Sequence, residues 1–201
     1  MKFFFNFCRN KGNIIDSIDK ELKILNATVL FFSNKKNVRD LREESDLFFS
    51  LETNFTKSIS LIVNDKSYYK QPYYWNEGFS IIMELKKIFA LFYSYYNKSI
   101  AFENKNINCS LLNNQQKIFN NMRRFFEIFL NKRDYAGEII KNNEYEINIY
   151  QEKYLKILNN DILLKPDFLK QIEVFRVFEK INERNEKIQN LMLKLMAVTN
   201  L

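Results

Sequence analysis

Residues 13–32 read NIIDSIDKELKILNATVLFF, and they set a pattern that the rest of the chain repeats. Their apolar residues recur at alternating steps of three and four, which is typical of the seam of a helical bundle or coiled coil. The members of this seam are Ile15, Ile18, Leu22, Leu25, Val29 and Phe32. The 201 residues contain only three glycines and two prolines, so little interrupts long helices. The composition therefore favours an all-α fold.

The same rhythm returns five times along the chain. Pro72 blocks an earlier start for the third helix, and Pro166 with Asp167 suits the first turn of the sixth. Neither alternating strand patterns nor glycine-rich turns suggest a sheet. We therefore predict six long helices in an antiparallel bundle. They cover residues 13–32, 38–63, 74–97, 111–132, 138–159 and a last stretch from Pro166 towards the C-terminus.

The longest polar connection covers residues 98–110 and separates three predicted helices from three more. This order suggests a duplicated unit. We predict a single all-helical domain over residues 1–201, built from two three-helix repeats at 12–98 and 111–199.

The residue types that are missing exclude several kinds of chemistry. The chain has no histidine, so Ser-His-Asp and Cys-His catalysis and histidine-based zinc sites are excluded. Three isolated glycines cannot build a phosphate-binding loop. Cys8 and Cys109 are too few for a disulfide framework, which fits a reduced compartment. We expect a non-enzymatic cytoplasmic protein, either soluble or peripheral to the inner membrane.

The formal net charge of +7 would permit binding to phosphate-bearing partners. A basic surface on the fourth helix, together with tyrosines elsewhere, could form a nucleic-acid interface. Its members are Arg123, Arg124, Lys132 and Arg133. A solvated helix face explains scattered charges more simply, so RNA or DNA binding is the second hypothesis rather than the first.

The Phe-rich start of the chain has two interpretations. It could lie in a membrane interface or on a membrane-protein partner, or it could cap one end of the bundle, which we favour. The residues concerned are Phe3, Phe4, Phe5 and Phe7, beside Lys2, Arg9 and Lys11.

Carboxylates four residues apart lie on one helix face, as Glu179 and Glu183 do, and as Asp40 and Glu44 do. Two such helices side by side could offer oxygen ligands to a hard cation. Paired carboxylates on a helix are more often a salt-bridged or solvated surface feature, and spacing alone leaves both interpretations open.

Four short segments occur in an order that resembles the PhoU-like family, helical proteins associated with phosphate transport and its regulation. The segments are LREESD at 41–46, NE at 76–77 followed by LKKI at 85–88, EYEIN at 144–148 and FEKINERNE at 178–186. The resemblance implies two three-helix repeats. It also implies a membrane transporter or another protein as partner. A purely structural or oligomerising bundle, with a second copy of the chain as partner, is a third hypothesis that does not depend on the resemblance.

The resemblance carries metal-cluster ligands over to five positions, Glu44, Asp46, Glu144, Glu179 and Glu183. A divalent metal at these carboxylates is the only cofactor it implies. Departures from the family pattern occur at Arg42, Lys86, Lys87 and Asn148. Each departure removes an anionic ligand, and the three cations would repel a metal. We therefore expect a metal-poor relative that acts through protein contacts at its helix faces.

Overall fold

The computed structural model describes residues 2–34, 45–63, 74–101, 109–131, 135–162 and 168–199. Within these ranges the chain is helical apart from single turn residues, and none of these residues lies in a strand. The elements are α1 (Lys2–Ser33), α3 (Ser45–Val63), α4 (Tyr74–Ala101), α5 (Cys109–Asn131), α6 (Ala136–Ile157), a π-helical stretch η3 (Leu158–Ile162) and α7 (Phe168–Thr199). The predicted all-α class is confirmed.

The helix bounds differ most at the first helix. The prediction that it begins near residue 13 is wrong, because α1 begins at Lys2 and continues through Gly12. One glycine inside a helix costs only about 1 kcal/mol, so it need not end the helix. Helix α4 likewise ends at Ala101, beyond the predicted residue 97. The first part of the predicted second helix, residues 38–44, lies outside the described residues.

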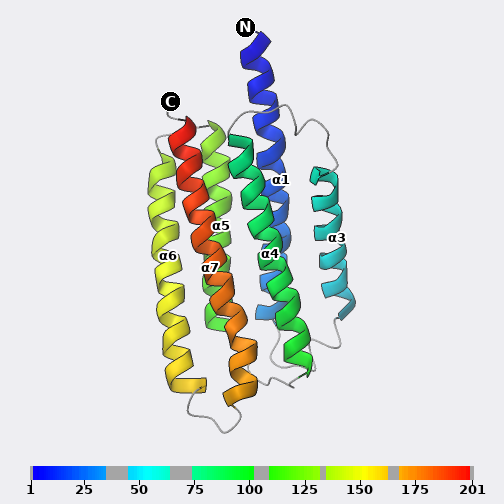
Figure 1. The fold of residues 1–201 in the computed structure, drawn as a ribbon, viewed down its shortest axis with the longest axis vertical. Coiled ribbons are helices and arrows are strands. Elements are labelled where there is room, and N and C mark those ends of the chain that lie inside the picture. Colours follow the sequence, from blue (N-terminus) through cyan, green and yellow to red (C-terminus); the bar gives the residue numbers. More distant parts are fainter. Residues whose placement is uncertain are drawn as a thin grey trace.

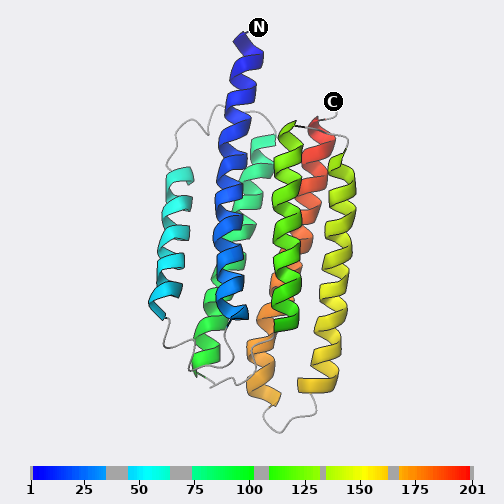
Figure 2. The same cartoon turned by 180° about the vertical axis from the view of Figure 1, so that it is seen from behind.

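Successive helices run in alternating directions along one long axis (Figure 1). Helix α1 contacts α3, α4 and α5, while α7 contacts α4 and α6 and α6 contacts α5. Five helices thus surround a common core, and α3 lies at one side against α1 and α4 (Figure 2). Both figures place α3 and α6 on opposite sides of the bundle.

The predicted seam of the first helix faces this core. All six of its members are buried, and so are many of the predicted stripe residues of the other described helices, such as Phe48, Phe92, Phe125, Ile147 and Ile181. Phe79, Ile172 and Leu191 are partly buried against the same core. The buried apolar side chains of all the described helices belong to one cluster. A single shared core therefore joins the two predicted repeats, while the division into two repeats itself stays a prediction.

Aromatic rings attach α3 to the bundle. Phe48 is fully buried, and its ring stacks on Tyr96 with centroids 4.4 Å apart. The rings of Phe31 and Phe32 from α1 and of Phe89 from α4 also lie within 6.3 Å of Phe48. Aromatic pairs at such distances add to the stability gained from area burial alone. Phe48 thus anchors the start of α3.

The first turns of α1 extend past the ends of the other helices in both views (Figures 1 and 2). The side chains of residues 2–13 lie outside the description, so the two interpretations of the Phe-rich start both stay predictions. Among the described helices, none combines the length and the apolar character needed to cross a bilayer.

Gly78 marks a close approach between α4 and α1. A Cβ added at Gly78 would lie 2.8 Å from Ile14 Cδ1, whereas a Cβ added at Gly137 would be 4.0 Å from its nearest neighbour, Met196 Cε. We expect Gly78→Ala to be less stable than Gly137→Ala by on the order of 1 kcal/mol, because the gain in helix propensity is offset by displacement of Ile14. Urea unfolding of both variants measures this difference. Equal free energies of unfolding would contradict it.

Candidate functional site

Four of the five carboxylates suggested by the resemblance are described. Asp46 lies in the first turn of α3, Glu144 lies in α6, and Glu179 and Glu183 lie in α7. All four side chains are exposed. Glu44, like Asp40 and Arg42, lies outside the described residues.

These carboxylates are not gathered in one place. Asp46 belongs to α3 and Glu144 to α6, and these helices lie on opposite sides of the bundle (Figure 1). Glu179 and Glu183 are one turn apart on α7, as their spacing predicts. Among the residues that the structure describes, no group of three or more acidic or cysteine side chains could hold a metal ion.

Glu179 has a neighbour that the motif did not indicate. The Tyr154 hydroxyl of α6 donates to Glu179 Oε2 at 3.5 Å, and the Tyr154 ring stacks on Phe175 with centroids 4.5 Å apart. Burial, together with the Glu179 carboxylate, raises the pKa of Tyr154 to about 12. Glu179 therefore takes part in the contact between α6 and α7.

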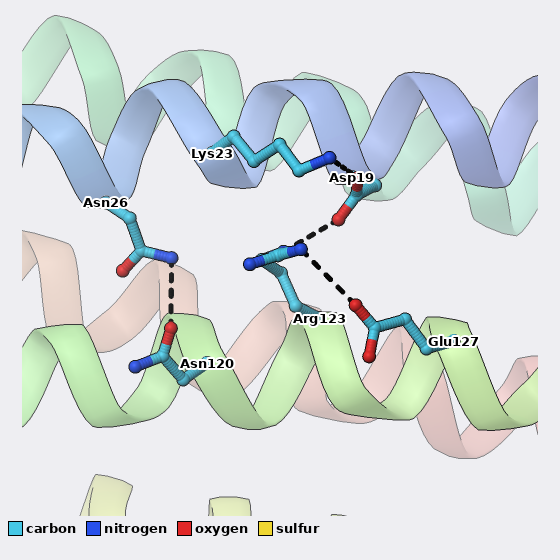
Figure 3. Close-up of polar contacts among 6 residues, drawn as sticks. All are labelled: Asp19, Lys23, Asn26, Asn120, Arg123 and Glu127. Atoms are coloured by element: carbon cyan, nitrogen blue, oxygen red, sulfur yellow. Dashed lines mark hydrogen bonds and ion pairs between the residues drawn. The ribbon is translucent and has the colours of Figure 1, made fainter.

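The basic positions of the second hypothesis fall into two groups. Arg124 is exposed, whereas Arg123 points between α5 and α1, where its Nε lies 2.7 Å from Asp19 Oδ1 (Figure 3). Arg123 Nη2 also lies 3.3 Å from Glu127 Oε1. Lys132 and Arg133 lie outside the described residues. The charge of Arg123 is thus largely offset by two carboxylates of the bundle.

Asp19 is the centre of this polar contact. Besides the contact with Arg123, Asp19 accepts a hydrogen bond from Lys23, whose Nζ lies 2.6 Å from Asp19 Oδ2. Two turns further along α1, Asn26 donates to Asn120 Oδ1 of α5 at 3.2 Å (Figure 3). Burial alone would raise the pKa of Asp19, but the hydrogen bonds from Lys23 and Arg123 outweigh it and hold the pKa below its usual value of 3.8.

A second charged contact joins α4 to α7. Glu84 is nearly buried, and its carboxylate lies 3.3 Å from Arg184 Nη1 and 2.6 Å from Lys87 Nζ. Lys87 is one of the cations at which the sequence departs from the family pattern, and Lys86 beside it is exposed. The departure at Lys87 therefore coincides with an ion pair within α4, in which the Lys87 side chain is 50% exposed.

Sequence reasoning missed the buried carboxamides of the second half. Gln115 and Asn185 exchange hydrogen bonds of 3.0 and 2.8 Å, and Asn143 donates to Gln189 Oε1 at 2.7 Å. All four side chains are buried. A signal was present, because Asn185 lies between Ile181 and Ile188 in an apolar seam.

No family model matches this chain, and no curated protein matches it either. The resemblance to the PhoU-like family therefore rests on the sequence segments themselves.

Protonation of Asp19 offers a test of the contact between α1 and α5. A carboxyl whose pKa is lowered by folding contributes stability above its unfolded pKa, and this contribution is lost as the pH falls through the folded value. We expect Asp19→Asn to lower the free energy of unfolding by roughly 0.5–1 kcal/mol at pH 7 and by less near pH 3, which lies below the usual Asp pKa of 3.8. Urea unfolding at both pH values measures this.

Asp16→Asn is the matched control for this experiment, because Asp16 is an exposed position of the same helix and loses the same charge. A loss for Asp19→Asn that is equal at pH 7 and pH 3 would show that the carboxylate does not carry the contact.

Proposed function

We propose that this chain is a non-catalytic accessory protein of membrane phosphate transport, which acts at the cytoplasmic face by docking a helix face against a protein partner. The proposal extends the resemblance of its four segments to the PhoU-like family. Metal binding at the acidic positions is secondary in it.

The observation that carries the proposal is the way in which the two halves meet. The first helix of one half, α1, contacts the first of the other, α5, and the third helices α4 and α7 contact each other. Both pairs run antiparallel (Figure 1). Two three-helix units related by an approximate two-fold axis would pair their equivalent helices in this way. This pairing supports the repeat organisation that the resemblance implies.

The two contacts between equivalent helices have similar chemistry. Asp19 and Arg123 link α1 to α5, and Glu84 and Arg184 link α4 to α7. Each ion pair lies at the edge of an apolar seam and is partly shielded from solvent. These charges hold helices together, which suits a protein that presents a rigid surface to a partner.

Outer faces of several helices carry exposed apolar side chains that a partner could cover. Leu47 of α3 is 52% exposed, Leu155 of α6 is 47% exposed and Leu193 of α7 is 46% exposed. The three positions lie on different helices and so sample different faces of the bundle.

The nucleic-acid hypothesis receives less support. When Lys or Arg side chains bind phosphates, they displace counterions from the nucleic acid, so cations already paired with carboxylates contribute little. Arg123 instead contacts Asp19 and Glu127, and this leaves Arg124 as the exposed member of the described pair.

Affinity purification of the tagged full chain from the cells that encode it tests the proposal. We expect it to recover a subunit of a membrane phosphate transporter after cross-linking, and the abundance of the chain to respond to phosphate supply. Recovery of no transport or phosphate-signalling component, together with an abundance indifferent to phosphate, would count decisively against the proposal.

Three variants identify the docking face in the same experiment. We expect one of Leu47→Glu, Leu155→Glu and Leu193→Glu to abolish recovery of the transporter subunit, because a charge at the contact is costly to bury. All three should leave the Tm within about 2 °C of the parent, since the positions are exposed. The two variants that retain recovery serve as controls for the one that loses it.

A further inference from the structure

Polar residues are buried among the apolar residues of both helices, namely Asn114 and Gln115 on α5 and Asn182, Asn185 and Gln189 on α7. Gln115 and Asn185 pair with each other. Their seam neighbours are buried apolar residues, Leu112, Ile118 and Met122 on α5 and Phe178, Ile181, Ile188 and Met192 on α7. The two polar residues lie opposite each other although 70 positions separate them.

The two carboxamides exchange one hydrogen bond in each direction across the contact. Gln115 Nε2 donates to Asn185 Oδ1 at 3.0 Å, and Asn185 Nδ2 donates to Gln115 Oε1 at 2.8 Å. The exposed fraction is 1% for Gln115 and 0% for Asn185, so water does not compete. A reciprocal amide pair in such a place forms in only one alignment of the two helices.

A second carboxamide contact joins α7 to α6. Asn143 Nδ2 donates to Gln189 Oε1 at 2.7 Å, and Gln189 Nε2 donates to the Ile140 carbonyl at 2.8 Å. Gln189 lies one turn after Asn185, so both bonds act on the same segment of α7.

Apolar seams alone would tolerate other alignments. Helix α7 packs mainly against α4 and α6. If it moved by one heptad along them, apolar side chains would still be buried against apolar side chains. Asn185 would then face the level of Met122, and both carboxamides would be buried without partners. Buried amides without hydrogen bonds are costly, so the displaced alignments are disfavoured.

We infer that the Gln115–Asn185 pair sets the register of α7 in the bundle and that it contributes uniqueness of alignment more than stability. Pairs of leucines would pack as well or better, because replacing both members of a buried polar pair is often neutral or stabilising. Leucine pairs would not favour one alignment of α7 in the bundle over another, because apolar contacts have no direction of their own. The inference does not depend on the proposed function.

Distance measurement between spin labels tests the inference on the full chain. Labels at the exposed positions Arg124, towards the C-terminal end of α5, and Lys170, near the N-terminal end of α7, report the alignment of the two helices in a Cys8→Ser and Cys109→Ser background. The two labels are offset along the bundle axis, so a slide of α7 changes the distance between them by nearly its own length. We expect one narrow distance in the parent. In Gln115→Leu/Asn185→Leu we expect a second component shifted by about 5 or about 10 Å, one helical turn or one heptad. The double variant should unfold at or above the Tm of the parent.

Two further variants separate polarity from packing. Met122→Leu/Met192→Leu changes two buried seam residues of the same helices and should keep a single distance. Gln115→Asn/Asn185→Gln exchanges the carboxamides and should also keep it, because an amide pair remains.

Three outcomes would overturn the inference. A single narrow distance in the double-leucine variant would show that other contacts set the register. Loss of cooperative unfolding in that variant would show that the pair is needed for stability. A second distance in the methionine control would show that any change in the seam disturbs the alignment.

Discussion

Helix α1 has to bury one apolar stripe against three neighbours at once, and this constraint organises the bundle. Its stripe approaches α4 so closely at Gly78 that Ile14 fills the space where a side chain would stand. At its other end, Phe32 lies among aromatic rings of α3 and α4. The burial of apolar surface drives these contacts but has no direction of its own. Orientation comes from polar side chains at the edges, such as Asp19 facing α5.

Periodicity was enough to predict the helices, because a 3.6-residue apolar rhythm without glycine or proline leaves few alternatives. It was insufficient for the helix ends. The predicted start of the first helix near residue 13 is wrong, because α1 continues through Gly12, where neighbouring turns offset the small cost of one glycine. The sequence pattern also does not predict which helices pack together, because the apolar stripe of α1 fits α4 and α5 equally well.

The polar contacts show why sites are harder to predict than helices. Arg123 looks like part of a basic surface in the sequence, but 104 positions away Asp19 completes an ion pair with it. Glu84 and Arg184 are likewise far apart along the chain. Asp46 and Glu144 occupy similar motifs, yet the fold places them on opposite sides. Asn185 differs, because an amide in an apolar seam is visible in the sequence, although its partner is not.

The position of α7 has a consequence for the synthesis of the protein. Helix α7 packs against α4 and α6 and forms side-chain hydrogen bonds with α5. The ribosome synthesises all three of these helices before α7. Until α7 emerges, these helices expose to solvent their apolar stripes and the carboxamides that α7 will pair. Such nascent chains attract chaperones and other chains. The bundle therefore closes late, and the cell must protect an incomplete core during most of translation.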